Sequence, residues 1–213
     1  MLVINFKAYA GAMGEKAREL AEKCSEAAER TGKEVVVAPQ PPDILRMEDL
    51  ELEVFSQHVD GTEPGSHTGH PLPESVSMAG ASGTLLNHSE RRLERKALKK
   101  SIDRAEEEGL TTLVCARSPE ECGELGELGP DYVAFEPPEL IGGEVSVSSA
   151  RPGMIEEAVS RSKPPVLTGA GVKTREDVEK SIELGCEGVL VASGVVKAKD
   201  PQEKIVELAE GLR

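Results

Sequence analysis

Residues 83–115, GTLLNHSERRLERKALKKSIDRAEEEGLTTLVC, predict a β-strand, a helix and a second β-strand in succession. The two ends, residues 83–87 and 111–115, are short apolar runs that do not alternate regularly with polar residues. Runs of this kind are typical of parallel strands that are buried on both faces. Between them, residues 90–108 carry apolar side chains at helical spacing: Leu93, Ala97, Leu98, Ile102 and Ala105. The stretch therefore predicts one unit of an α/β fold.

The same unit recurs along the whole chain. Eight short apolar runs occupy residues 2–6, 34–38, 52–58, 83–87, 111–115, 131–135, 165–168 and 188–192. Segments with helical spacing lie between them, and Asp200-Pro201 reads as the capped start of a last helix. Eight strand–helix units predict a single compact (β/α)8 barrel domain over residues 1–213. A doubly wound open sheet is the alternative, but no GxGxxG follows the first run.

The chain is strongly acidic. Its 213 residues include 39 Asp and Glu against 25 Lys and Arg, so the formal net charge is −14. Such a surface repels nucleic acid phosphates and anionic membrane faces, so neither is expected as a partner. No window approaches the roughly 18 apolar residues of a spanning helix, and no signal-peptide pattern is seen, so we expect a cytoplasmic protein. The acidity is also typical of halophilic organisms, in which dense counterions screen the self-repulsion.

No metal or cofactor site is indicated. The four cysteines form no CxxC pair and lie within predicted strands and helices: Cys24, Cys115, Cys122 and Cys186. Free buried thiols in a reducing compartment are therefore expected, rather than disulfides or zinc ligands. His67 and His70 lie close together in a polar loop, residues 60–73, but they lack a partner cysteine or a suitable carboxylate pattern. We therefore expect no metal at this loop either.

In a barrel of this kind the functional residues lie at the C-terminal ends of the strands. Asn5 and Lys7 follow the first run, and His88 follows the fourth. Glu136 follows the sixth run, so a carboxylate, an imidazole and an ammonium are expected on one rim. A carboxylate that is covered by a loop loses water, which raises its pKa and makes it a stronger base. Lys7 is expected to hold an oxyanion or a phosphate.

His88 is distinguished from the other histidines by the segment that follows it. Ser89-Glu90 is expected to open the helix over residues 90–108, directly behind the imidazole. A helix N-terminus disfavours additional positive charge. We therefore expect His88 to be neutral and to donate one N–H.

Small-residue loops on the same rim indicate an anion site and a lid. Gly169-Ala170-Gly171 follows the seventh run, and Ala192-Ser193-Gly194 follows the eighth. Loops at these two positions frequently bind phosphate in barrels, because their backbone N–H groups can approach an anion closely. After Glu136, Pro137-Pro138 stiffens the start of a loop and Gly142-Gly143 frees its end. This composition predicts a hinged lid.

Several motifs together carry a family resemblance. Asn5-x-Lys7, Asn87-His88-Ser89-Glu90-Arg91 and the segment AFEPPELIG at residues 134–142 resemble triosephosphate isomerases. Two further segments, at residues 57–60 and 193–197, are similar to the archaeal branch of that family. The resemblance spans nearly the whole chain.

The resemblance implies interconversion of dihydroxyacetone phosphate and D-glyceraldehyde 3-phosphate without a metal or cofactor, in glycolysis or gluconeogenesis. It implies that Glu136 transfers the carbon-bound proton, that neutral His88 polarises the carbonyl, and that Lys7 stabilises the oxyanion. Asn5 would orient the substrate or His88, and Glu90 would support the polar network behind them. Backbone N–H groups of four residues would hold the phosphate: Ile141, Gly171, Ala192 and Ser193.

The family also implies an oligomer, and compact archaeal members tend to be tetramers. A homotetramer is therefore expected, with a homodimer as the alternative, and the loop over residues 60–73 would lie in the dimer contact. Closure of a lid over residues 136–143 would exclude water from the reaction.

Two other functions stay open on the residues alone. Another phosphate-binding barrel, such as a sugar-phosphate isomerase of amino-acid or thiamine biosynthesis, would fit the loops after the seventh and eighth runs equally well. It would place different groups at the positions of Lys7, His88 and Glu136. A non-catalytic barrel that serves as a binding protein would not need this set of residues.

Overall fold

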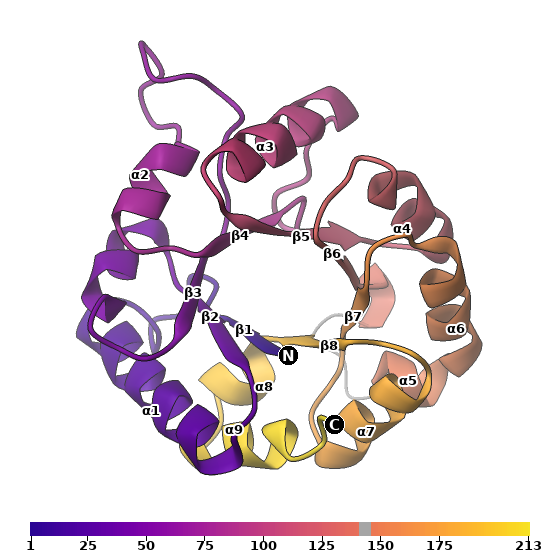
Figure 1. Cartoon of the computed structure of the whole chain (residues 1–213). Helices are drawn as coiled ribbons and strands as arrows, with labels where there is room; N and C mark the ends of the chain where they lie inside the picture. The colour runs from indigo at the N-terminus through magenta and orange to yellow at the C-terminus, as the bar shows by residue number, and fades with distance from the viewer. Residues whose placement is uncertain (141–145) are drawn as a thin grey trace.

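Eight parallel strands close into a barrel in chain order, which confirms the predicted fold class (Figure 1). The computed structural model describes residues 1–140 and 146–213. The strands are β1 (Leu2–Asn5), β2 (Val35–Ala38), β3 (Glu53–Ser56), β4 (Gly83–Leu86), β5 (Thr111–Ala116), β6 (Tyr132–Phe135), β7 (Val166–Gly169) and β8 (Gly188–Val191). The barrel closes where β8 pairs with β1, with Leu2 opposite Val189.

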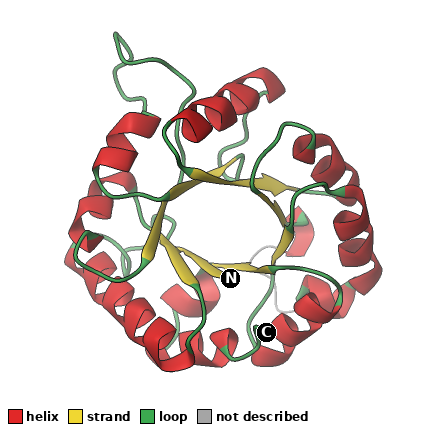
Figure 2. Cartoon of the chain, in the orientation of Figure 1, coloured by secondary structure: helices red, strands yellow, loops and turns green. Residues whose placement is uncertain are grey.

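Helices form the outer layer around the strands (Figure 2). They are α1 (Glu15–Thr31), η1 (Pro41–Met47), α2 (Pro73–Met78), α3 (Arg95–Glu107), α4 (Pro119–Gly126), η2 (Pro138–Leu140), α5 (Val147–Ala150), α6 (Pro152–Arg161), α7 (Arg175–Glu183), α8 (Ser193–Val196) and α9 (Pro201–Ala209). Among the described residues, none of these helices has the length and apolar character needed to cross a membrane.

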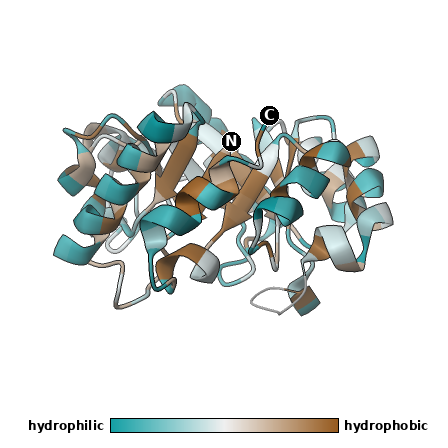
Figure 3. Ribbon diagram, turned by 90° about the horizontal axis from the view of Figure 1, so that it is seen from below, coloured by the Kyte–Doolittle hydropathy of each residue, from teal (hydrophilic) through white to brown (hydrophobic). Residues whose placement is uncertain are grey.

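The strands are apolar on both faces because each face packs against a different layer. Val3 belongs to a cluster inside the barrel, whereas Leu2 and Ile4 belong to the cluster between strands and helices. The hydropathy colouring shows the same division, with hydrophobic strands and more hydrophilic outer helices (Figure 3). Inside the barrel, Phe55 fills the space beside Gly83, where an added Cβ would lie 2.4 Å from the ring.

Several helix ends follow the local signals in the sequence. Gly32 ends α1 in the left-handed conformation at φ 65°, which favours glycine because it has no Cβ. Thr174 and Asp177 form a capping box at the start of α7. The Asp200 side chain accepts the Glu203 N–H at the start of α9, where Pro201 follows the cap. These signals position the loops that leave β7 and β8.

The expected start of the helix behind His88 is wrong. We expected residues 90–108 to be helical from Ser89-Glu90 onward, but α3 begins at Arg95. Tertiary contacts of Asn87 override the local helical pattern. Its side-chain Oδ1 accepts the Leu93 N–H at 3.0 Å, while Arg92 donates to its carbonyl oxygen at 3.3 Å. The chain therefore folds around Asn87 before the helix starts.

The polar loop after β3 extends outward from the barrel (Figure 1). We call residues 60–72 the arm. Near the start of the arm, Gly61 packs on α3, where an added Cβ would lie 2.5 Å from backbone atoms of Lys100 and Ser101. Arg104 on α3 also forms an ion pair with Glu63 of the arm at 3.6 Å. The base of the arm is thus attached to α3.

Candidate active site

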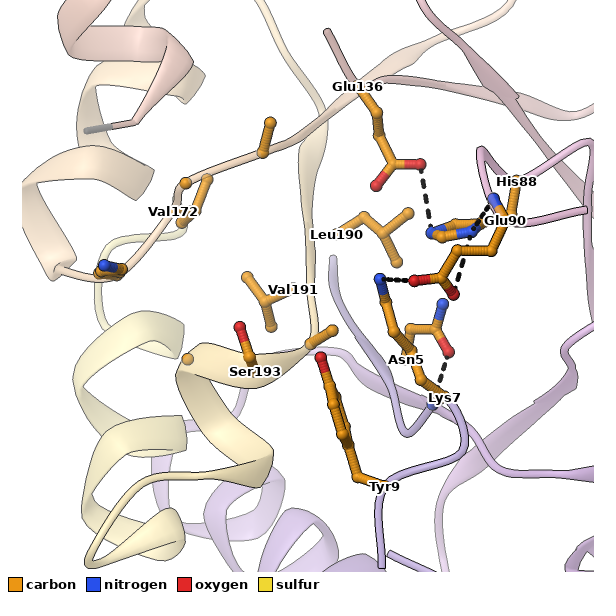
Figure 4. A pocket seen from close by; sticks show the side chains of 15 residues that line it. Asn5, Lys7, Tyr9, His88, Glu90, Glu136, Val172, Leu190, Val191 and Ser193 are labelled. Carbon is orange, nitrogen blue, oxygen red and sulfur yellow. Dashed lines mark hydrogen bonds and ion pairs between the residues drawn. The ribbon is translucent and has the colours of Figure 1, made fainter. Parts of the chain in front are cut away.

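A pocket of about 260 Å³ lies at the C-terminal end of the barrel. Residues from the ends of five strands line it, and Figure 4 shows their side chains. The lining contains eight of the predicted site residues: Asn5, Lys7, His88, Glu90, Glu136, Gly171, Ala192 and Ser193. The parallel strands bring these residues together because all their C-terminal ends meet at one rim.

Glu136 and His88 face each other across the pocket. Oε2 of Glu136 lies 3.7 Å from Nε2 of His88 (Figure 4), and both side chains are nearly buried. Burial raises the pKa of Glu136 above its ordinary value, and the nearby His88 ring, Cys115 thiol and Lys7 ammonium only partly oppose that effect. Within the described residues, Oε2 has no hydrogen-bond partner. A buried hydrogen-bond acceptor without a partner costs free energy of folding, and groups of this kind call for a functional explanation. This oxygen is available to accept a proton from a bound molecule.

The Glu136 carboxylate has room because β7 ends in a glycine. A Cβ at Gly169 would lie 2.7 Å from Cγ of Glu136 and 3.0 Å from Oε1. The Cys115 thiol on β5 contacts the carboxylate from another side. The sequence analysis did not predict that Gly169 makes room for the Glu136 side chain. The sequence feature that could have indicated it is the position of Gly169 at the end of β7, beside the strand that Glu136 follows.

The orientation of His88 is set by Glu90. The Glu90 backbone N–H donates to Nδ1 of His88 at 3.2 Å, so Nδ1 acts as an acceptor. A neutral imidazole with this bond carries its proton on Nε2, the nitrogen that faces Glu136. We expected a helix N-terminus to favour the neutral form, but α3 starts too far along the chain to do so. A turn, and not a helix, supplies the N–H.

His88 follows a residue that is held in an unusual conformation. Asn87 has φ 59°, a value that non-glycine residues rarely adopt. Its side-chain amide donates to the Cys115 carbonyl at 2.9 Å, and its Oδ1 accepts the Leu93 N–H. These bonds attach the chain to the neighbouring strand at the point where His88 leaves β4. Backbone strain that is stabilised in this way is typical of functional sites.

Lys7 is held in the same manner at the end of β1. It has φ 48°, and its N–H donates to Oδ1 of Asn5 at 2.9 Å. Gln57 donates to the Lys7 carbonyl at 2.9 Å and to the Ala38 carbonyl at 3.0 Å. The Lys7 ammonium forms an ion pair with Oε1 of Glu90 at 2.8 Å. Gln57 is a site residue that the sequence reasoning assigned no role, although it lies one residue beyond the end of β3 on the same rim.

The loops after β7 and β8 close the opposite side of the pocket. Ala170 has φ 147° and Gly171 has φ 71°, so the chain turns sharply as it leaves β7. After β8, Ala192 leads into the short helix α8, which begins at Ser193. Seven further residues, which are not among the predicted site residues, also line the pocket: Tyr9, Ala170, Val172, Lys173, Leu190, Val191 and Gly194. A pocket with loops of this kind after β7 and β8 matches the position at which barrels bind phosphate.

Part of the predicted lid is not covered by the structure. Pro137 and Pro138 follow Glu136, and Pro138 begins η2. Ile141, Gly142 and Gly143 lie outside the described residues. Among the described residues there is no cluster of His, Cys, Asp and Glu that could hold a metal ion. The four cysteines are buried and free, as expected.

Comparisons with known proteins give one family. A sequence model of the family described as triosephosphate isomerase matches residues 1–210. Triosephosphate isomerase of Methanopyrus kandleri is 46% identical, with 99% of this chain and 97% of the relative covered. Those of Methanosarcina barkeri (44%; 97% and 96% covered) and Methanothermus fervidus (42%; 98% and 96% covered) are similar over almost the same span. The chain belongs to the triosephosphate isomerase family.

Proposed function

We propose that this protein isomerises dihydroxyacetone phosphate and D-glyceraldehyde 3-phosphate, with Glu136 as the base. The observation that carries the proposal is the pairing of a buried carboxylate with Nε2 of His88 at 3.7 Å, in a pocket closed on its other side by the loops after β7 and β8. A triose phosphate has a carbonyl and a carbon acid at one end and a phosphoryl group at the other. The pocket provides groups that suit both ends.

Glu136 performs the proton transfer. It takes a proton from the carbon next to the substrate carbonyl, and the electron pair of that C–H bond forms the C=C bond of an enediolate. The carbonyl π electrons move to oxygen. His88 gives a proton to that oxygen and takes one from the neighbouring hydroxyl, whose O–H electron pair forms the new C=O bond as the carbon-bound proton is returned to the neighbouring carbon. Because burial raises the pKa of Glu136, its carboxylate accepts a proton more readily than an exposed one.

His88 and Lys7 stabilise the oxygen that becomes negative. Nε2–H of His88 points to the side of the pocket that Glu136 also faces, so it can donate to the substrate oxygen at the moment Glu136 takes the proton. The Lys7 ammonium adds positive charge, and its ion pair with Glu90 fixes its position. Asn5 holds the Lys7 backbone. A preorganised donor of this kind typically contributes about 2.7–4 kcal/mol to transition-state stabilisation.

The phosphoryl group is assigned to the loops after β7 and β8. Backbone N–H groups of Gly171, Ala192 and Ser193 would donate to its oxygens, together with that of Ile141. A phosphate dianion must enter a protein of net charge −14. Local donors and Lys7 therefore have to reverse the field inside the pocket, because the charge of the whole protein opposes binding. The lid over residues 136–143 stays a prediction.

Substitution of the two central residues tests the assignment. In a coupled assay with D-glyceraldehyde 3-phosphate, Glu136→Gln and His88→Gln should each lower kcat by orders of magnitude while circular dichroism shows an unchanged fold. Glu127→Gln is a matched control, because Glu127 is an exposed carboxylate that pairs with Lys163 far from the pocket. A near-wild-type rate in either folded active-site variant would refute the proposal. Wild-type protein that binds the substrate without turnover would indicate a binding protein instead.

We also propose that the protein is a homotetramer, with a homodimer as the alternative, and that the arm contacts another copy. The attachment of the arm to α3 through Gly61 and Arg104 supports this, because an arm held in one conformation loses less entropy when it docks. Gly61→Ala should push the arm away from α3 and reduce the mass measured by light scattering. Gly65→Ala, whose added Cβ meets nothing closer than 3.9 Å, should leave the mass unchanged. A monomeric wild-type protein at high salt would contradict the proposal.

We also propose that the protein acts in sugar breakdown or synthesis, in the cytoplasm of a halophilic organism. The net charge of −14 supports the last point, because a surface of this charge gains from dense counterions. Stability that does not change between low and molar KCl would count against it.

A further inference from the structure

Tyr9 lines the pocket but has no part in the proposed reaction. It lies in the loop after β1, two residues beyond Lys7. Figure 4 shows its ring extending from that loop, with the hydroxyl directed into the pocket on the side where Ser193 begins α8. Glu136 and His88 lie at the other end of the pocket in this view. The phenol is therefore placed toward the phosphoryl end of a bound triose phosphate.

Tyr9 is held at its backbone and at its ring. The Ala12 N–H donates to the Tyr9 carbonyl at 2.8 Å, which fixes the turn that carries the side chain. The Lys197 ammonium lies 4.6 Å from the centroid of the ring, a cation–π contact from the residue that follows α8. This contact joins the loop after β1 to the loop after β8. The hydroxyl is thus presented on a ring that is fixed relative to the anion site.

Within the described residues, neither the Tyr9 hydroxyl nor the Lys197 ammonium has an acidic partner. No protein group in that part of the chain accepts a hydrogen bond from the Tyr9 hydroxyl, and Lys197 forms no ion pair there. Lys7, by contrast, is paired with Glu90 at 2.8 Å. In a chain with 39 acidic and 25 basic residues, a lysine that contacts a pocket-lining ring and has no acidic partner within the described residues is a positive charge that can act on a bound anion.

We propose that Tyr9, supported by Lys197, is a side-chain determinant of specificity for the phosphoryl group. The Tyr9 hydroxyl donates a hydrogen bond to a phosphoryl oxygen, and Lys197 holds the ring and adds positive charge. Phosphoryl oxygens accept several hydrogen bonds at once, so this contact adds to those of the backbone N–H groups. The inference rests on the proposed function, because that function assigns the phosphoryl group to this side of the pocket.

Tyr9→Phe tests the inference with two substrates, D-glyceraldehyde 3-phosphate and unphosphorylated D-glyceraldehyde. Loss of a hydrogen bond to a charged group should lower kcat/KM for the phosphorylated substrate roughly ten- to hundredfold, mainly through KM. The slow turnover of D-glyceraldehyde should not change. Inhibition by inorganic phosphate should weaken by a similar factor. Lys197→Met should shift the same constants in the same direction but less, and the shift should shrink in molar KCl.

Tyr132→Phe is the matched control, because Tyr132 is the other tyrosine of the chain and begins β6, at the end of the strand opposite to the pocket. It should leave all constants unchanged. Equal losses on both substrates in Tyr9→Phe would overturn the inference, since they would mean a general role in the fold or the chemistry. No loss on either substrate would overturn it as well. If wild-type protein isomerises neither substrate, the proposed function fails, whereas calorimetric binding of inorganic phosphate to wild type and Tyr9→Phe still decides the inference.

Discussion

Replacement of Gly169 by alanine should displace Glu136, the proposed base, without replacing any group that takes part in the proposed reaction. The added Cβ would lie 2.7 Å from Cγ of Glu136, whereas ordinary contacts begin at 3.4 Å. Gly169 is not among the residues with positive φ, so alanine can adopt its backbone conformation and the conflict is one of space. Glu136 must therefore retreat by about 0.7 Å, the difference between the two distances.

The expected effect on kcat follows from that displacement. A misplacement of about 1 Å can cost roughly 100-fold in rate, so we expect kcat to fall between about ten- and hundredfold. The displaced carboxylate has little room, because the nearly buried His88 and the Cys115 thiol already lie next to it. Overpacking of this kind typically destabilises a protein by about 1–3 kcal/mol, so the thermal midpoint should also fall. KM should change much less than kcat.

The assay is steady-state isomerisation of D-glyceraldehyde 3-phosphate with a coupled dehydrogenase, together with a thermal melt. Gly153→Ala is the matched control, because an added Cβ on that residue of α6 meets no atom within 4 Å. It should keep the wild-type kcat. The reasoning fails if Gly169→Ala shows the kcat and thermal midpoint of wild type, since the carboxylate would then not depend on the space beside it.

Three further predictions concern charge and burial. Glu136→Gln should raise the thermal midpoint at neutral pH but not in acid. Burial raises the pKa of Glu136 in the folded state, so the ionised carboxylate lowers the stability of the wild type at a pH above that pKa. Protonation restores this stability as the pH falls through the folded-state pKa. The thermal midpoint of wild type should rise from low to molar KCl, because salt screens the repulsion within a net charge of −14; an unchanged midpoint would argue against a halophilic surface. The buried thiols should not react with a thiol reagent at mildly alkaline pH until the protein is unfolded. Burial raises the pKa of Cys186 to about 11 and that of Cys115 well above its usual value, so neither forms the reactive thiolate. Rapid reaction of the native protein would contradict this prediction.

The sequence alone predicts the barrel and most of its rim. Apolar runs without alternation, separated by amphipathic helices, leave few arrangements other than a parallel sheet covered by helices. Once eight such units close into a barrel, the residue after each strand must lie on one rim. The sequence therefore predicts that Lys7, His88 and Glu136 share one pocket, because their positions depend on local patterns and a general rule of topology.

Other features were decided by contacts between residues far apart in the chain. Residues 90–94 have a helical composition, but Asn87 draws this segment into a turn that orients His88. Three further features depend on how neighbouring strands and loops pack. They are the space for Glu136 beside Gly169, the hydrogen bond from Gln57 to the Lys7 carbonyl, and the direction of the Tyr9 hydroxyl. Local propensity acts over a few residues, whereas these distances are set by barrel closure and side-chain packing. Periodicity can therefore say which residues share a rim, and only the folded chain decides which of their atoms meet.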